Sequence, residues 1–176
     1  MNRRALLAGL AAAVLALAGC GGPPRPSFKA TDITGANFGK YLSLTDHHGK
    51  PRNLEDFKGK VIVVFFGYTQ CPDVCPTTLA TLKEVKERLG PDGKRLQVLF
   101  VTVDPERDTE QLLALYVPAF DPDFLGLYGD LEATAQAAKE FKVFYSKTPG
   151  KTPTSYTIDH SAGVFLYDTQ GRIRLF

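Results

Sequence analysis

Methionine and histidine are both scarce in this chain. The only methionine is Met1, and the only histidines are His47, His48 and His160. Because Met1 belongs to a segment that we expect to be removed, no thioether remains in the mature chain. A site for a soft metal would therefore have to be built from cysteine thiolates and histidine imidazoles. Three cysteines are present, Cys20, Cys71 and Cys75.

An excess of charge of one sign is also absent. The chain has 21 Lys and Arg and 19 Asp and Glu, and the expected loss of Arg3 and Arg4 makes the two classes equal. Without a basic excess or a run of basic residues, the chain lacks the surface that a phosphate backbone requires, so we expect no nucleic-acid partner. Repeats are missing too. The 176 residues, 44% of them hydrophobic and 23% charged, predict one globular domain rather than a fibrous, disordered or multi-span membrane protein.

The longest hydrophobic run lies at the N-terminus. Arg3 and Arg4 precede an apolar stretch over residues 5–18, which is typical of an export signal and short for a permanent membrane span. Residues 17–20, Leu-Ala-Gly-Cys, resemble the bacterial lipobox, in which the cysteine becomes the lipidated first residue after cleavage. An uncleaved anchor is the alternative.

Three regions are predicted on this basis. We expect a lipoprotein signal peptide at residues 1–19, a lipidated Cys20 with a flexible tether to residue 37, and a folded domain over residues 38–176. Such a protein would lie outside the cytoplasm, held by its lipid to the periplasmic face of the cytoplasmic membrane.

The remaining pattern alternates strands with helices. The run Val61–Phe66 is typical of a central strand buried on both faces, and a helix entered at Cys71–Pro76 should face the sheet with Leu79, Leu82, Val85 and Leu89. Further strands are predicted at 41–45, 52–54, 96–103, 156–158, 163–167 and 172–176, further helices at 110–117 and 131–141, and an exposed loop at 146–154. The fold class is therefore α/β, a central mixed β-sheet flanked by helices, with an N-terminal and a C-terminal β-hairpin.

Cys71 and Cys75 lie where a buried strand ends and a helix begins. Ligands bind in this crevice of open α/β sheets, and the helix N-terminus favours anions, so we expect lowered thiol pKa values and ready thiolate formation. The four-residue spacing lets the two sulfurs converge on one ion or on each other. His160, just before the strand at 163–167, is the best candidate for a third ligand.

Three segments in this order resemble the Sco/SenC family of copper-handling proteins: FFGYTQCPDVCP at 65–76, VDPERDT at 103–109 and DHS at 159–161. The resemblance implies a thioredoxin-like fold and one copper ion, as Cu(I) or Cu(II), bound by Cys71, Cys75 and His160. It also places Asp104 and Asp159 near the site, where they would orient the ligands or a docking partner. The family's closing helix is not seen after Phe176, so we expect either a truncated C-terminus or an apolar edge without cover.

The function implied by the resemblance is that of a membrane-anchored copper chaperone. It would deliver copper to the binuclear copper site of cytochrome c oxidase, with subunit II of the oxidase or another periplasmic copper acceptor as its partner. The main alternative is a thiol-disulfide oxidoreductase, in which Cys71 and Cys75 are the catalytic pair that reduces the acceptor's copper-ligand cysteines. A thioredoxin-like reductant is then a further candidate partner.

Other interpretations are weaker. A purely structural disulfide between Cys71 and Cys75 would close too small a loop to stabilise the fold much. Peroxide reduction would need a threonine three residues before Cys71, where Tyr68 stands. We expect Tyr68 to belong to the core, the pair His47 and His48 to be solvated, and the acidic turn 104–109 to be either functional or only a helix cap.

Overall fold

The computed structural model describes residues 27–152 and 155–176. The predicted signal peptide, Cys20 and the first part of the predicted tether lie outside these residues. Within them, no helix has both the length and the apolar character needed to cross a membrane. The elements, in chain order, are β1 Leu44–Asp46, β2 Pro51–Arg52, η1 Leu54–Phe57, β3 Val61–Gly67, α2 Val74–Arg88, η2 Gly90–Arg95, β4 Leu96–Thr102, α3 Glu110–Tyr116, β5 Leu125–Tyr128, α4 Leu131–Glu140, β6 Tyr145–Pro149, β7 Tyr156–His160, β8 Val164–Tyr167 and β9 Ile173–Leu175.

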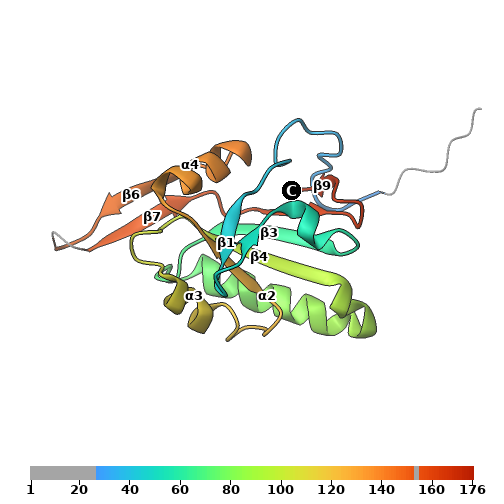
Figure 1. Ribbon diagram of the computed structural model, residues 1–176, viewed down its shortest axis with the longest axis horizontal. Helices are drawn as coiled ribbons and strands as arrows, with labels where there is room; N and C mark the ends of the chain where they lie inside the picture. Colours follow the sequence, from blue (N-terminus) through green and yellow to red (C-terminus); the bar gives the residue numbers. More distant parts are fainter. Residues whose placement is uncertain (1–26, 153–154) are drawn as a thin grey trace, which may run out of the picture.

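The main sheet is mixed and has the strand order β2-β1-β5-β4-β3-β8-β9. Strands β3, β4 and β5 run parallel, and β1, β2, β8 and β9 add antiparallel pairs on either side. Helices α2 and α3 lie on one side of the sheet and α4 on the other (Figure 1). The expected fold class and both expected hairpins are confirmed, although the sequence pattern did not reveal β5.

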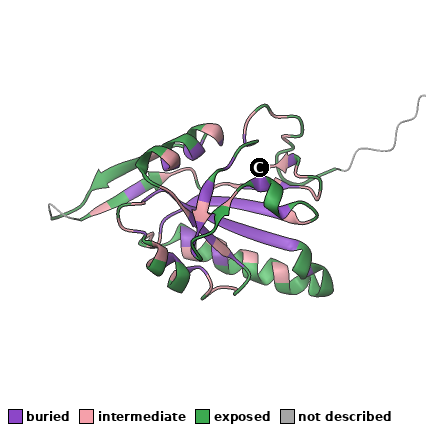
Figure 2. Cartoon of the chain, in the orientation of Figure 1, coloured by how far each residue is buried: buried purple, intermediate pink, exposed green. Residues whose placement is uncertain are grey.

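The core sits around β3 and β4, whose residues are buried almost throughout (Figure 2). Successive side chains of β3 alternate between the faces, so Phe65 packs with Phe100 whereas Phe66 packs with Phe141, which follows α4. A strand buried on both faces needs apolar side chains at every position, which explains its unbroken hydrophobic run.

The segment predicted as the exposed loop 146–154 contains strand β6 instead. It pairs antiparallel with β7, with Tyr145 opposite His160 and Pro149 opposite Tyr156. The polar composition of β6 concealed the strand, because it pairs in a hairpin that is mostly exposed rather than in the core. This β6–β7 hairpin projects from the body of the molecule (Figure 1).

The edge of β9, expected to lack cover, is paired with the N-terminal segment. Thr31 and Phe176 exchange two backbone hydrogen bonds of 3.1 and 3.0 Å, and the Ile33 amide donates to the Arg174 carbonyl. The Phe176 ring also packs on Phe165, at 5.0 Å between centroids. The chain before β1 therefore covers the last strand of the sheet.

Helix α2 turns a different face to the sheet from the one predicted. Cys75 and Leu79 are fully buried and Leu82 is half-buried, but Val85 and Leu89 are exposed. The next inward position belongs to Lys86, whose Nζ donates to Asp121 at 2.5 Å and to Asp123 at 2.7 Å. The buried face is thus the row 75, 79, 82 and 86, one side of a helix with 3.6 residues per turn.

Substitutions on α2 test this orientation. Leu79→Ala should lower the free energy of unfolding by about 2–5 kcal/mol, because it opens a cavity in the core. Val85→Ala should change it by less than about 0.5 kcal/mol, since that side chain faces solvent. Urea unfolding of both variants measures the difference, and equal losses would contradict the assigned face.

Candidate metal centre

Cys71 and Cys75 are held at the junction of β3 and α2. Cys75 is the second residue of the helix and is fully buried, whereas Cys71 precedes the helix and is half-buried. The Asp73 side chain makes no capping hydrogen bond, and the Cys75 amide donates to the Cys71 sulfur at 3.4 Å. The Cys71 sulfur therefore accepts a hydrogen bond from one of the backbone amides that have no partner within the helix at its start.

Gly67, the last residue of β3, permits the close approach of the helix. A Cβ at this position would lie 2.8 Å from the Cys75 sulfur and 2.8 Å from the Phe100 ring. The absence of a side chain is what lets Cys75 sit against the end of the sheet.

His160, the last residue of β7, meets the two cysteines from the other side. Its Nε2 lies 3.6 Å from the Cys75 sulfur, and one donor atom from each of Cys71, Cys75 and His160 lies within 4.8 Å of the others. No other such group of three occurs among the described residues. The expected convergence of these side chains is confirmed, although 85 residues separate Cys75 from His160.

The imidazole of His160 is oriented by its second nitrogen. Nδ1 lies 3.0 Å from the Ser161 carbonyl oxygen, which can only accept a hydrogen bond, so the proton belongs on Nδ1. The lone pair of Nε2 then faces the sulfurs, as in histidines that bind metals. The rings of Tyr68 and Phe65 pack edge-on to the imidazole at 5.9 and 6.3 Å between centroids.

The electrostatics of Cys75 differ from the expectation. Burial raises the pKa of the Cys75 thiol, and the neighbouring Cys71 and Asp108 act in the same direction. The prediction of a lowered pKa is therefore wrong for Cys75, because desolvation of the thiolate outweighs the field of the helix N-terminus. A cation bound at the site would supply the positive charge that stabilises the Cys75 thiolate.

The donor set fits copper. Two sulfurs and one imidazole nitrogen are soft and borderline donors, which suit Cu(I) and Cu(II) and do not suit Mg²⁺ or Ca²⁺. With three protein donors the set also falls short of the four that close a structural zinc site.

The two aspartates expected near the site have different surroundings. Asp104 is fully buried and accepts from Arg107 Nε at 2.5 Å and from the Tyr156 hydroxyl at 2.8 Å. Asp159 is exposed, lines the same cavity as His160, and accepts from the Thr148 hydroxyl at 2.9 Å. Neither carboxylate belongs to the cluster of candidate ligands.

Asp108 is a buried residue whose contribution sequence reasoning missed. Its carboxylate accepts from the Thr69 amide and hydroxyl and from the Thr102 hydroxyl, at 3.0, 2.5 and 2.6 Å. It thereby fastens the loop before Cys71 to the end of β4. The acidic turn 104–109 is the one sequence signal for this role of Asp108, but the same pattern also predicts a helix cap. Thr109 does cap α3, because its hydroxyl accepts from the Leu112 amide.

Tyr68 is both a core residue, as expected, and a wall of the site. Its ring is buried, and its hydroxyl oxygen accepts from the Ile158 amide of β7 at 3.2 Å. The cavity of about 320 Å³ that Tyr68 lines also reaches Cys71, Asp73 and His160.

The expectation of a solvated histidine pair is wrong for His47. His47 is 4% exposed, its Nδ1 accepts from the Gly126 amide at 2.9 Å, and its ring packs 4.2 Å from that of His48. Burial lowers the pKa of His47, so its neutral form is favoured. This histidine is a structural link between β1 and β5, where it closes the turn after β1.

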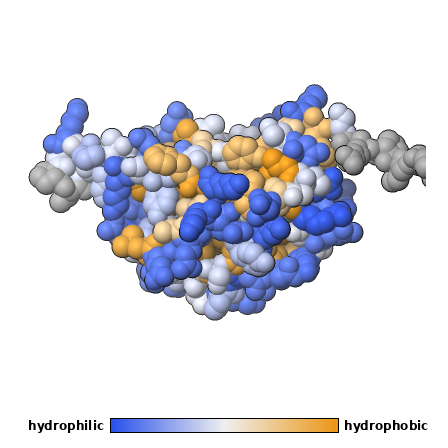
Figure 3. Space-filling view, turned by 90° about the horizontal axis from the view of Figure 1, so that it is seen from above, coloured by the Kyte–Doolittle hydropathy of each residue, from blue (hydrophilic) through white to orange (hydrophobic). Residues whose placement is uncertain are grey.

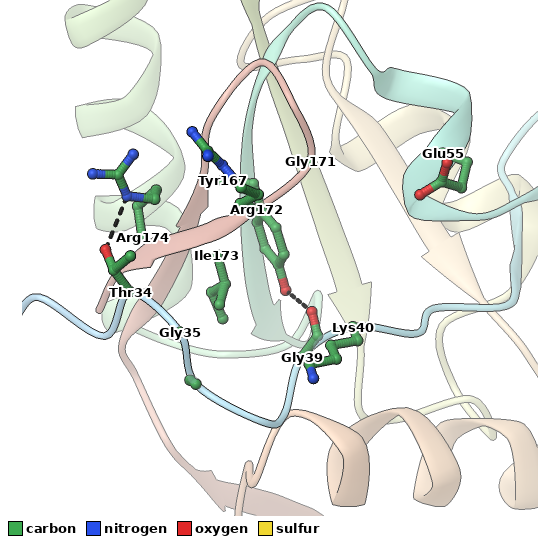
Figure 4. A pocket seen from close by; sticks show the side chains of 11 residues that line it. Thr34, Gly35, Gly39, Lys40, Glu55, Tyr167, Gly171, Arg172, Ile173 and Arg174 are labelled. Atoms are coloured by element: carbon green, nitrogen blue, oxygen red, sulfur yellow. Dashed lines mark hydrogen bonds between the residues drawn. The ribbon is translucent and has the colours of Figure 1, made fainter.

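A larger cavity of about 600 Å³ lies away from the cysteines, between the N-terminal segment and the β8–β9 hairpin (Figure 4). The Tyr167 hydroxyl donates to the Gly39 carbonyl oxygen at 2.5 Å and Arg174 Nε to the Thr34 hydroxyl at 2.9 Å (Figure 4). No cysteine or histidine lines it, whereas Cys71 and His160 line the smaller cavity. The face seen in Figure 3 carries separate apolar patches between charged side chains.

Known proteins resemble the chain over most of its length. A family model described as SCO1/SenC matches residues 30–176. The mouse protein SCO2 homolog, mitochondrial, is 42% identical over 132 residues, 74% of this chain and 52% of its own length, so the chain spans about half of that relative. Copper-bound ScoI from Bradyrhizobium japonicum is 41% identical with a TM-score of 0.73, over 78% of this chain and 87% of that one. Apo Sco1 from Thermus thermophilus is 42% identical with a TM-score of 0.71, and the match covers 85% of this chain and 88% of that one. These neighbours confirm the expected thioredoxin-like fold.

Gly67→Ala tests the packing of Cys75 against the sheet. The added methyl group should push Cys75 or Phe100 aside and lower the free energy of unfolding by about 1–3 kcal/mol. It should also speed the reaction of Cys75 with a thiol reagent, followed by mass spectrometry of each cysteine. Unchanged stability and unchanged Cys75 reactivity would show that the close approach does not matter.

Proposed function

The chain belongs to the SCO1/SenC family, and we propose that it is a copper chaperone that presents one copper ion to an acceptor in the assembly of cytochrome c oxidase. The observation that carries the proposal is the approach of three soft donors, Cys71, Cys75 and His160, within 4.8 Å. Copper bound in a structural neighbour with 41% sequence identity supports the choice of metal.

The burial of the donors suggests an order of transfer. Cys71 and His160 are half-buried and line the cavity, whereas Cys75 is fully buried and does not line it. An incoming acceptor thiolate meets the first two donors before it reaches Cys75. Copper would then pass by stepwise exchange of ligands, with the Cys75 bond broken last and the ion never free in solution.

The location of the protein is part of the proposal. We infer that residues 1–19 are removed as a signal peptide and that Cys20 carries lipid, which holds the folded domain on the periplasmic face of the cytoplasmic membrane. Residues 31–33, expected to belong to the tether, pair with β9 and so belong to the domain, which leaves the residues before them as the tether. The acceptor would be subunit II of the oxidase or another periplasmic copper protein. Asp159, exposed beside His160, is proposed to take part in docking, and Asp104 to orient the strand that carries His160.

Copper titration of the reduced protein tests the ligand set. We expect one equivalent of Cu(I), and loss of tight binding in Cys71→Ala and Cys75→Ala, because a single thiolate cannot satisfy the ion. His160→Ala should lower the affinity for Cu(II) by more than about 100-fold, since removing a residue that only hydrogen-bonds to a metal ligand already lowers metal affinity by about 10–100-fold. His48→Ala is the matched control, an exposed histidine away from the site. Stoichiometric copper in the double cysteine variant would reject the chaperone.

A second function is favoured by the state of the cysteines, which are both free and whose sulfurs lie within 4.8 Å of each other. In this alternative the Cys71 thiolate attacks an acceptor disulfide, forms a mixed disulfide and releases one acceptor thiolate. Cys75 then attacks the Cys71 sulfur and releases the second acceptor thiolate, which leaves a Cys71–Cys75 disulfide and transfers two electrons to the acceptor.

An oxidised acceptor fragment separates the two functions. One experiment mixes the oxidised fragment with the reduced, metal-free protein, and a second mixes a pre-reduced fragment with the copper-loaded protein. If the protein is mainly a chaperone, the first fragment should stay oxidised over the time in which the second takes up copper. Mass spectrometry of the trapped thiols follows both reactions. Rapid reduction of the fragment without copper, lost in Cys71→Ala, would favour the oxidoreductase instead.

A further inference from the structure

Arg107 occupies an unusual position beside the candidate metal centre. The carbon of its guanidinium group lies 3.5 Å from the centroid of the Tyr156 ring and 5.8 Å from that of Tyr68, so the cation is within cation–π distance of two aromatic rings. Its Nε donates to the Asp104 carboxylate, and its Nη1 donates to the Tyr156 carbonyl oxygen and to the Gln70 side chain, both at 3.0 Å. The side chain is 19% exposed.

These contacts join three segments that meet at the site. Arg107 and Asp104 follow β4, Gln70 directly precedes Cys71, and Tyr156 begins the strand that ends at His160. The Tyr156 hydroxyl also donates to Asp104 at 2.8 Å. Arg107 is therefore the one side chain, among those described, that bonds to both the cysteine loop and the histidine strand.

The histidine strand needs such contacts. Strand β7 pairs only with β6 in the described structure, and this two-stranded hairpin has no ladder to the main sheet. A lone hairpin is marginally stable in water. Besides the contact of His160 with Cys75, three hydrogen bonds hold β7 to the body. Arg107 donates to the Tyr156 carbonyl oxygen, the Tyr156 hydroxyl donates to Asp104, and the Ile158 amide donates to the Tyr68 hydroxyl.

Charge neutralisation alone does not account for this arrangement. The buried Asp104 carboxylate requires a cation, and Nε of Arg107 supplies it. A lysine would supply the same charge. Nε donates to Asp104 while Nη1 donates to Gln70 and Tyr156, so the contacts need two nitrogens of the planar guanidinium group, and lysine has only one.

We propose that Arg107 is a positioning residue that holds β7 at the distance from which His160 Nε2 reaches the sulfurs. This inference rests on the proposed copper site. Two thiolates alone satisfy the soft Cu(I) ion, whereas Cu(II) gains more from the imidazole. Arg107, through Tyr156, therefore sets the preference of the site for Cu(II) and leaves Cu(I) binding to the cysteines.

The test compares Arg107→Lys with Arg172→Lys. The control replaces another arginine that is paired with an aspartate, Asp168, in the turn between β8 and β9. Arg107→Lys keeps a charge for Asp104 and should weaken Cu(II) by about 10–100-fold, as for other residues that orient a metal ligand. The nitrogen hyperfine coupling in the Cu(II) electron paramagnetic resonance spectrum should fall, while Cu(I) affinity stays that of the unmodified protein.

A metal-free measurement gives a second readout. Amide hydrogen exchange at residues 156–160 should be faster in Arg107→Lys than in Arg172→Lys, because the strand loses an anchor. Tyr156→Leu, which removes the ring and the hydroxyl and leaves Arg107 with Asp104, should show the same pattern and carries the test if Arg107→Lys does not fold.

Three outcomes would overturn the proposal: Cu(II) binding like that of the control, equal weakening of Cu(I) and Cu(II), or unchanged amide exchange in β7. His160→Ala separates this failure from failure of the ligand set. If His160→Ala weakens Cu(II) and Arg107→Lys does not, only the role of Arg107 is lost. If His160→Ala leaves Cu(II) binding unchanged, the proposed ligand set fails and the inference about Arg107 fails with it.

Discussion

Contact between the Cys75 sulfur and the His160 imidazole is the constraint on which the rest of the site depends. The two residues come from opposite parts of the domain, one from the start of α2 and the other from the end of β7, and they meet at 3.6 Å. Gly67 permits the close approach of Cys75, and the Tyr68 hydroxyl accepts a hydrogen bond from the Ile158 amide of β7. The acidic turn after β4 holds both partners, through Asp108 on the cysteine loop and through Asp104 and Arg107 on the strand.

The burial of Cys75 decides how the site behaves without metal. A helix N-terminus stabilises an anion by about 0.3–2 kcal/mol, whereas removing a charged group from water costs several kcal/mol. The second effect is the larger, and it raises the pKa of the Cys75 thiol. A neutral buried thiol is protected from oxidation, since the thiolate is the reactive form, and it can give up its proton when copper arrives.

The sequence predicted the elements that carry their own pattern. The apolar run at 61–66 and the cysteine spacing each identify their structures locally, and the resemblance to the family predicted that His160 lies beside the cysteines. Other features depend on tertiary partners. Strand β6 has polar residues and becomes a strand through β7, and Val85 has the hydrophobicity of a core residue but not its position on α2. His47 is buried because β5, which has no strong pattern of its own, presents the Gly126 amide to it.

The pairing of residues 31–33 with β9 determines the direction in which the domain can be presented. The described chain begins beside this strand, at one end of the long axis, and the β6–β7 hairpin projects at the other (Figure 1). A protein held through its N-terminal side, as proposed above, would therefore turn the β6–β7 hairpin, which ends at His160, away from the point of attachment.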